Sequence, residues 1–342
     1  MTTLYIDRKG LSLRADSSAL AFYDESGRVG TVPLKVLERV CIRGDVQLSA
    51  QVLGKLGEHG VGLVVLSGRQ RKPVLMMPNV KTDARRREAQ FALAADPAFC
   101  LQISCFWLQA KLGGQLAWLQ ALSQESAALR AAMYHHMANI EHLIAQLPQA
   151  ATLEALRGME GAAAAHYFAA LALKLPDSLK FHGRNRQPPK DPFNSVLSLG
   201  YTLLHFEWVR QIYLAGLDPF CGFLHTILPG RESLACDLLE PFRPLYDQWA
   251  WQLFAEGVLR PEDFSSARDR CDMGKPARLR YYAAFETAAK LWRPKMHAAI
   301  MTLLHKLGQA CPHTDADCFT LSEWQVVSKP ETEPDDALAD CV

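Results

Sequence analysis

The sequence lacks the features that send a protein into or across a membrane. Its opening residues contain no basic stretch followed by an apolar core, because Thr2, Thr3, Asp7 and Arg8 interrupt them. No apolar run reaches the length that a bilayer-spanning helix needs. We therefore expect no membrane partner and a cytoplasmic location.

Paired cysteines are also missing. The nine cysteines of the 342-residue chain are scattered, odd in number and without a Cys-x-x-Cys motif, which is typical of reduced thiols in a cytosol. Cys311, His313 and Cys318 are close in sequence but lack the two-residue ligand spacing of structural zinc sites. We therefore expect neither a disulfide framework nor a structural zinc.

The chain has little net charge, at a formal +1. From Lys329 onward one lysine stands against five acidic residues, so the rest of the chain carries a net charge of about +5. That balance suits an anionic partner, although many ordinary enzymes share it. Hydrophobic residues at 49% and charged residues at 21% supply buried cores and exclude a wholly disordered chain.

Residues 1–80 predict a small β-rich domain. Short apolar runs alternate with turns such as residues 24–27, which is the rhythm of an antiparallel sheet. A helix is expected over residues 50–58 with Ser49 as its N-cap, followed by a strand buried on both faces over residues 61–66. Breakers between residues 73 and 83 indicate a connection, and we place the linker at residues 81–88.

Residues 89–325 predict a larger all-helical domain, because apolar residues recur there at three- and four-residue spacing. The expected helices cover residues 89–95, 101–122, 126–147, 153–175, 195–215, 234–254 and 278–307. Residues 326–342 are acidic and poor in apolar side chains, so we expect a disordered tail. The fold class is therefore α+β.

Two isolated polar residues of the helical region are candidate site residues. Glu160 lies among small and apolar residues, where a buried carboxylate needs a neutralising partner. The simpler alternative is a partly exposed glutamate near a helix start, stabilised by the helix dipole. His225 follows the uncharged run 219–224 and is either a ligand or a hydrogen-bonded core histidine.

A third segment carries two acids. Asp237 and Glu240 are three residues apart, so they share one helix face and repel each other unless a cation is near. Pro241 predicts that the helix kinks or ends directly after Glu240. Carboxylates with one imidazole suit Mg²⁺ or Mn²⁺ better than zinc, and such an ion can activate a phosphodiester. The spacing alone names no substrate.

Four motifs, in order, resemble the signature of the CRISPR-associated integrase, the first and most widespread Cas protein. They are L-R-G-M-E-G at 156–161, D-P-F-N-S-V-L-S at 191–198 with Gly200-Tyr201, G-F-L-H-T at 222–226 and S-L-A-C-D-L-L-E-P-F-R-P at 233–244. The resemblance extends from the opening L-Y-I-D to about Leu307. It implies that Glu160, His225 and Glu240 are catalytic metal ligands, with Asp237 as an accessory acid.

This resemblance implies a metal-dependent DNA endonuclease and integrase of CRISPR adaptation. The enzyme would use Mg²⁺ or Mn²⁺ to join foreign DNA fragments as new spacers into the repeat array by 3′-hydroxyl attack on a phosphodiester. It also implies a β-rich dimerisation domain, a helical catalytic domain, a homodimer, assembly with the small second Cas protein and a prokaryotic cytoplasm. Two alternatives remain: a DNA-binding scaffold without metal, and a repair nuclease for branched DNA outside CRISPR.

Two basic runs are candidates for DNA contact. Bound phosphates would give these runs a salt-sensitive affinity that is largely independent of sequence. The alternative is an ordinary solvated surface. The first run is Lys180, Arg184, Arg186 and Lys190, and the second is Arg268, Arg270, Lys275, Arg278 and Arg280.

Overall fold

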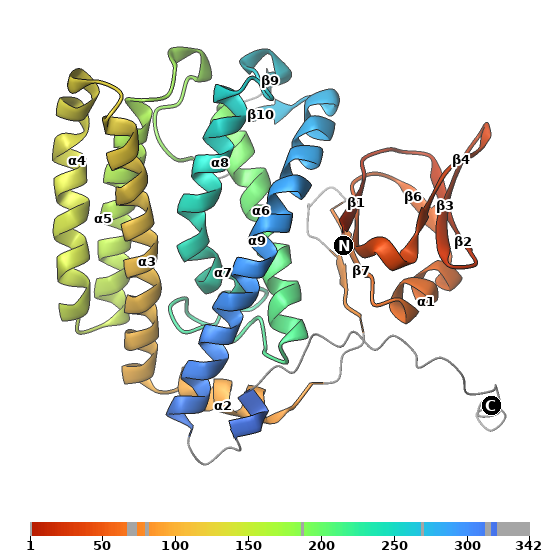
Figure 1. Ribbon diagram of the computed structural model, residues 1–342, viewed down its shortest axis with the longest axis horizontal. Helices are drawn as coiled ribbons and strands as arrows, with labels where there is room; N and C mark the ends of the chain where they lie inside the picture. The colour runs from red at the N-terminus through yellow and green to blue at the C-terminus, as the bar shows by residue number, and fades with distance from the viewer. Residues whose placement is uncertain are drawn as a thin grey trace. The chain divides into compact units, whose positions relative to one another are not determined.

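The computed structural model describes residues 2–66, 74–78, 82–185, 188–267, 270–311 and 316–319. Contacts within the chain separate a β-rich unit from a helical unit between Thr82 and Asp83 (Figure 1). The α+β fold class is confirmed. The expected tail, residues 326–342, lies outside the described residues.

The β-rich unit contains two four-stranded sheets, with strand orders β1-β5-β7-β8 and β4-β3-β2-β6. The strands β2, β3 and β4 pair antiparallel, as the turn rhythm predicts. By contrast, β5 pairs in parallel with both β1 and β7, so the expectation of an antiparallel sheet holds for only part of the unit. The elements are β1 (Thr2–Ile6), β2 (Leu11–Asp16), β3 (Ala19–Asp24), β4 (Gly27–Pro33), β5 (Leu37–Ile42), β6 (Val46–Leu48), α1 (Ala50–Glu58), β7 (Gly62–Val65) and β8 (Val74–Met76).

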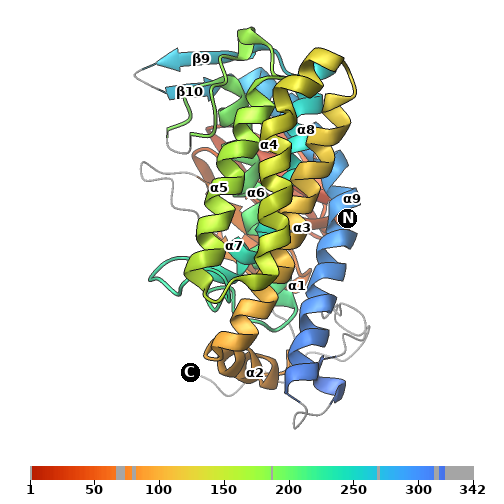
Figure 2. The same ribbon diagram turned by 90° about the vertical axis from the view of Figure 1, so that its left-hand side faces the viewer.

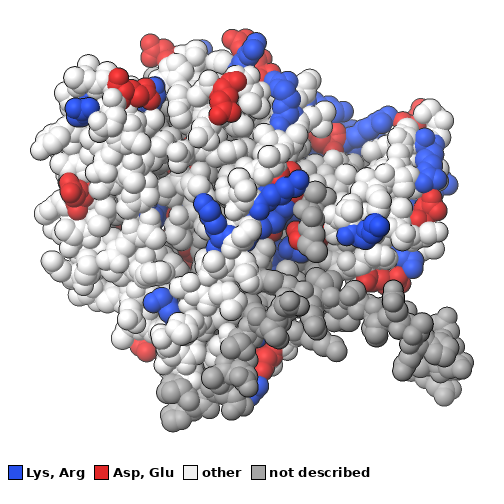
Figure 3. Space-filling model, viewed as in Figure 1, with Lys and Arg blue, Asp and Glu red and all other residues white. Residues whose placement is uncertain are grey.

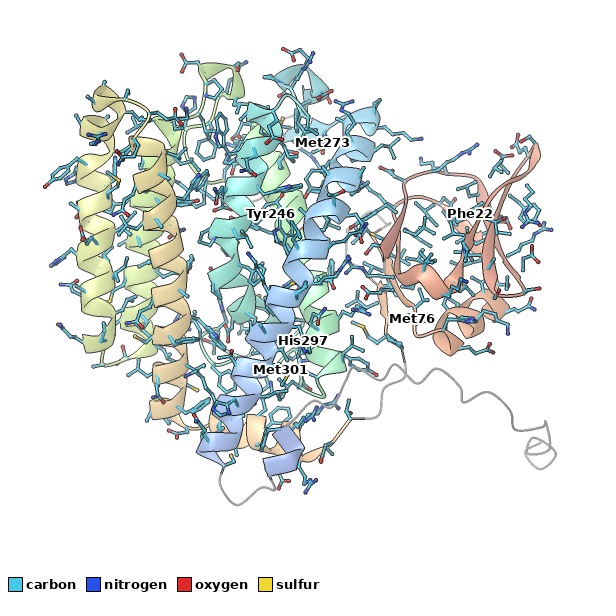
Figure 4. The ribbon with its side chains drawn as sticks, viewed as in Figure 1. Phe22, Met76, Tyr246, Met273, His297 and Met301 are labelled. Carbon is cyan, nitrogen blue, oxygen red and sulfur yellow. The ribbon has the colours of Figure 1, made fainter. Side chains whose placement is uncertain are left out.

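The core of this unit follows the predicted pattern closely. Ser49 caps α1, with its hydroxyl accepting from the Val52 backbone N–H, and Val52 and Leu56 of α1 are buried with the strands. Phe22, labelled in Figure 4, packs against the same core. Residues 62–64 of β7 are buried, as expected for a strand covered on both faces, and β7 is paired with β5 and β8. Residues 74–76, expected to be part of an irregular connection, instead form β8 against β7.

The helical unit is built from long helices in two groups. α3, α4 and α5 pack side by side, and α6, α8 and α9 form a second group (Figures 1 and 2). α3 also contacts α8 and the turn before it, which joins the two groups. The helices are α2 (Arg85–Ala94), α3 (Pro97–Ser123), α4 (Ala127–Gln146), α5 (Leu153–Ala172), α6 (Pro192–Leu214), α7 (Ser233–Leu239), α8 (Arg243–Ala255) and α9 (Lys275–Ala310).

Two departures from the expected helices matter for the site. The expected helix over 234–254 is divided: α7 ends at Leu239, Glu240–Phe242 form a 3₁₀ turn, and α8 begins at Arg243, as Pro241 predicts. The unit is also not all-helical, because β9 (Phe264–Ala267) and β10 (Arg270–Met273) form an antiparallel hairpin before α9. Strands of four residues are too short to show a clear period.

Among the described residues, no single helix has both the length and the apolar composition to span a membrane. α2 and α3 pass that test only as a pair, and they are bent by 95°. The cysteines of the described part of the chain are free thiols. Cys311 and Cys318 are among them, while His313 lies outside the described residues.

Gly200 of α6 tests the packing between the helices of the second group. A Cβ at this position would lie 1.9 Å from Cζ and Oη of the Tyr246 side chain, which is buried. We expect Gly200→Ala to lower the free energy of unfolding by about 3 kcal/mol, because the ring has to move within a filled core. Urea unfolding followed by circular dichroism measures the change.

The matched control is Gly113→Ala in α3, where a Cβ meets nothing within 4 Å. Alanine is the better helix former, so this variant should gain up to about 1 kcal/mol. Equal effects of the two substitutions would contradict the packing of Tyr246 on α6.

Candidate functional site

Glu160 projects from the middle of α5. The helix begins after Thr152, whose hydroxyl accepts from the Ala155 backbone N–H at 3.1 Å. Glu160 is therefore about two turns inside the helix, and its side chain is only 19% exposed. The alternative of a glutamate at a helix start is wrong, and Glu160 needs a positive partner instead of a helix dipole.

Glu240 occupies the break between α7 and α8. Pro241 cannot donate a backbone hydrogen bond, so the chain passes through a 3₁₀ turn that begins at Glu240. The Glu240 side chain is 4% exposed. Arg243, the first residue of α8, donates from Nε to Glu240 Oε2 at 2.8 Å. The break thus supplies both a buried carboxylate and a cation for it.

Lys111 of α3 brings the two glutamates together. Its Nζ donates to Glu160 Oε1 at 2.5 Å and to Glu240 Oε2 at 2.6 Å. With Arg243 these side chains form a group of two cations and two carboxylates, which we call the acid–lysine cluster. Its members come from α3, α5 and the α7–α8 break, so three separate parts of the helical unit meet there.

The cluster sets the protonation state of Glu240. Burial alone would raise the pKa of this carboxyl, but the nearby Arg243 and Lys111 outweigh burial and hold the pKa at about 2. The His225 ring lowers it further, which places His225 within electrostatic range of Glu240. Glu240 is therefore ionised throughout the physiological pH range, as a cation ligand has to be.

His225 is held by Asp237. The ring nitrogen Nδ1 lies 2.6 Å from Asp237 Oδ1, and the fully buried carboxylate also accepts from the backbone N–H groups of Phe223, Leu224 and His225. An Nδ1–H bound to a carboxylate leaves Nε2 as the acceptor of the ring. The His225 side chain is 24% exposed, so it is not a fully buried core histidine.

The donor set fits a divalent ion in part. Two carboxylate oxygens converge on one cationic nitrogen, and an imidazole stands within electrostatic range; these are ligand types that Mg²⁺ and Mn²⁺ accept. Within the described ranges, however, no three His, Cys, Asp or Glu side chains stand close enough together to hold a metal ion. The structure joins Glu160 to Glu240 through Lys111 and leaves His225 on Asp237.

A buried tyrosine–aspartate group contacts the cluster through Arg243. Asp247 of α8 accepts from the hydroxyls of Tyr167, at 3.0 Å, and Tyr201. The Arg243 guanidinium lies 4.3 Å from the centre of the Tyr201 ring and so connects this group to Glu240. Burial raises the pKa of Asp247 to about 6, although the hydrogen bonds from both tyrosines act against it. The neighbouring Tyr246, labelled in Figure 4, shares its hydroxyl with Tyr281 of α9 at 3.0 Å.

Sequence reasoning missed Lys111, although a signal was available. Lys111 stands on the buried face of α3 in phase with Trp107, Leu108 and Gln115, and a lysine is almost never fully buried without a partner. Asp247 is a comparable isolated acid on α8. The motifs that carry the resemblance lie within residues 156–161 and 191–244, outside α3.

The structure brings part of the two basic runs together. The backbone N–H of Cys271 in β10 donates to the Pro189 carbonyl at 2.7 Å, which places the β9–β10 hairpin beside the loop that precedes α6, at one end of the helical unit (Figure 2). Lys180, Lys190 and Lys275 are exposed. Arg186 and Arg268 lie outside the described residues.

The arginines of these runs are engaged in internal contacts. Arg184 donates to Asn194 Oδ1 and Ser198 Oγ. Arg270 pairs with Asp272, Arg278 donates to the Met273 carbonyl, and Arg280 pairs with Asp263. On the face of the helical unit in Figure 3, Lys and Arg stand in small separate groups. The exposed lysines are therefore the better candidates for phosphate contact.

Asp247 gives the site a testable pH dependence. In the folded protein its carboxyl holds a proton up to a pH of about 6, against an ordinary value of 3.8. The folded state therefore binds more protons than the unfolded chain between these values, so the stability of the protein rises as the pH falls through this window. Replacing Asp247 with asparagine removes this contribution.

We expect the free energy of unfolding of the wild type to gain about 2 kcal/mol relative to Asp247→Asn between pH 7 and pH 4. Urea unfolding of both proteins across that range measures the gain. The exposed Asp177, replaced by asparagine, is the control and should show no such gain. Parallel curves for wild type and Asp247→Asn would contradict the raised pKa.

Comparisons with known proteins agree with this architecture. The family model described as CRISPR associated protein Cas1 matches residues 4–287. A protein of Thermodesulfovibrio yellowstonii, named CRISPR-associated endonuclease Cas1 1, is 33% identical over 313 residues, which cover 90% of this chain and 98% of the relative.

Solved structures share the fold at lower identity. A Cas1 protein from Thermotoga maritima aligns with a TM-score of 0.76 at 20% identity, over 90% of this chain and 97% of that one. A casposase bound to integration product aligns with 0.77 at 22%, over 97% and 95%. A chain of a Cas6-RT-Cas1–Cas2 complex aligns with 0.75 at 21%, over 91% of this chain and 35% of that one.

The match to the family model covers most of the chain, and the bacterial relative aligns over nearly its whole length. The segments that carry Glu160, His225 and Glu240 all lie inside the matched range. The chain belongs to the Cas1 family of CRISPR-associated proteins.

Proposed function

We propose that this chain is a divalent-metal-dependent DNA endonuclease and integrase of CRISPR adaptation. The observation that supports this best is the convergence of Glu160 and Glu240 on one cationic nitrogen from two separate helical segments. The names of the relatives support the nuclease activity, and the casposase bound to integration product supports strand transfer as the chemistry of the fold.

Glu160, His225 and Glu240 would hold Mg²⁺ or Mn²⁺. The two carboxylates offer oxygen ligands, and His225 offers Nε2, because Nδ1 is already bound to Asp237. When bound, the ion would polarise the scissile phosphodiester and stabilise the leaving oxygen. Asp237 acts through His225: its carboxylate fixes the orientation of the ring.

The protein side of the reaction follows from these positions. In strand transfer the 3′-oxygen of a DNA fragment forms a bond to a repeat phosphorus while the bond from that phosphorus to its 3′-oxygen breaks. If it does not bind the ion, His225 Nε2 would instead accept the proton of the attacking hydroxyl, or of water in hydrolysis, and return it to the departing 3′-oxygen. Arg243 would remain beside Glu240 and keep the carboxylate ionised.

The partners belong to the same proposal. DNA would be contacted through the exposed lysines near the β9–β10 hairpin. The β-rich unit would serve homodimerisation. The second Cas protein would complete the complex, and the Cas6-RT-Cas1–Cas2 complex, one chain of which shares this fold, supports that assembly.

The function is tested with Glu160→Gln and Glu240→Gln, which keep size and remove charge. We expect each to lower Mn²⁺-dependent cleavage and spacer integration at least about 100-fold, because transition-state charge is left unstabilised. Glu141→Gln, an exposed residue of α4, is the control and should stay active.

Three outcomes would redirect the proposal. DNA binding without any metal-dependent cleavage by the wild type would indicate a scaffold. Cleavage of branched DNA without integration into a repeat would indicate a repair nuclease. Full activity of Glu160→Gln would remove the acid–lysine cluster from the chemistry.

DNA binding is tested at Lys190 and Lys275, two exposed lysines near the hairpin. We expect the double alanine variant to lower the slope of log affinity against log salt by about 2, since each lost phosphate contact lowers it by about 1. Fluorescence anisotropy with duplex DNA measures the slope. The control is Lys55→Ala, which breaks a surface pair with Glu58 in the β-rich unit. An equal slope for all proteins would contradict DNA contact through Lys190 and Lys275.

A further inference from the structure

Lys111 is an unusual residue for the interior of a metal-dependent site. Its side chain is 4% exposed, and its ammonium lies between Glu160 and Glu240 at 2.5 and 2.6 Å. These two carboxylates are the ones that the proposed function assigns to a divalent ion. The ammonium therefore occupies the place where the oxygens of both glutamates converge.

Two cations do not share that place. An ammonium and a divalent ion bound to the same two carboxylates would lie within a few ångströms of each other, and like charges repel strongly in an interior of low dielectric. A carboxylate oxygen that already contacts Nζ also attracts a second cation less strongly. Arg243 already adds a second positive charge to Glu240. Lys111 therefore competes with a divalent ion for Glu160 and Glu240, unless it has somewhere else to go.

Gln115 offers such a place. It follows Lys111 by four residues on α3, so the two side chains are neighbours on one helix face. Helical side chains lean toward the N-terminus, which directs Gln115 back toward the turn of Lys111. Gln115 is 2% exposed, and its carbonyl oxygen Oε1 is buried without a hydrogen-bond partner among the described residues.

An unpaired buried carbonyl is costly and rare. An acceptor of this kind, one turn from a buried lysine, offers the ammonium one further hydrogen-bond acceptor. It also explains why a polar side chain stands there in the apolar stripe of α3, between Trp107 and Leu108 on one side and Trp118 and Leu119 on the other.

We propose that Lys111 is a displaceable resident cation. In the resting protein it holds Glu160 and Glu240 together, and it swings to Gln115 Oε1 when a divalent ion binds between the two carboxylates. Lys111 is thus a positioning residue that sets the metal affinity of the site. This inference rests on the proposed function, because it assumes that these carboxylates are metal ligands.

The test is Mn²⁺ binding, measured by calorimetry and by the loss of the free-ion electron paramagnetic resonance signal, without DNA. Lys111→Met removes the competing charge and should bind Mn²⁺ roughly tenfold more tightly or better, while its melting temperature without metal falls. Gln115→Leu removes the second acceptor and should bind Mn²⁺ more weakly. Gln120→Leu, an exposed position of the same helix, should match the wild type.

The two substitutions have opposite signs, which a merely structural lysine does not predict. Unchanged Mn²⁺ affinity in both variants would overturn the inference and make Lys111 a fixed counter-ion. Should Lys111→Met fail to fold, Gln115→Leu decides alone: weaker binding supports the inference, and wild-type affinity overturns it.

Glu160→Gln separates this inference from the proposed function. If it abolishes Mn²⁺ binding while Lys111 and Gln115 variants leave the affinity unchanged, the metal site stands and the inference fails. If the wild type binds no Mn²⁺ but Lys111→Met does, the ion does not displace Lys111, and both the inference and the metal dependence of the wild-type enzyme fail. If the Lys111 and Gln115 variants shift the affinity as expected but the wild type cleaves no DNA with Mn²⁺, the inference stands and the proposed function fails. If no variant binds Mn²⁺, both fail.

Discussion

The pairing of buried charges in the acid–lysine cluster is the constraint on which the helical unit depends. Lys111 lies on α3 and Glu160 on α5. Glu240 lies in the break between α7 and α8, and Arg243 begins α8. A buried charge without its partner costs about 3–5 kcal/mol, so the cluster is stable only when all three segments are docked. The same requirement that selects this arrangement of helices also assembles the candidate active site.

The loop that carries His225 needs a glycine at position 222. Gly222 precedes the loop that carries His225, and a Cβ there would lie 2.7 Å from Asp237 Oδ2 and 2.8 Å from the Ser233 backbone. Only glycine permits the loop to approach α7 so closely that Asp237 reaches its backbone N–H groups. The G-F-L-H-T motif is therefore a packing requirement as well as a chemical one.

The sequence predicted what depends on local order. Pro241 predicted the helix break at Glu240, and the three- and four-residue spacing of apolar residues predicted the long helices. It did not predict which residue would stand opposite the glutamates, because Lys111 is distant in sequence from both. For the same reason it missed the parallel pairing of β1 with β5, since alternation along a strand does not identify the neighbouring strand. The short β9–β10 hairpin carried too few residues for any period.

Asp237 in α7 and Glu240 in the 3₁₀ turn that follows are two nearby acids with different surroundings. Asp237 is neutralised largely by backbone N–H groups and by the His225 ring, and backbone donors cannot leave without unfolding the loop. Glu240 is neutralised by the side chains of Lys111 and Arg243, which can rotate. A carboxylate held by the backbone supports a structure, whereas one held by mobile side chains can exchange its partner. That difference, and not the distance between the acids, makes Glu240 the better candidate for a metal ligand.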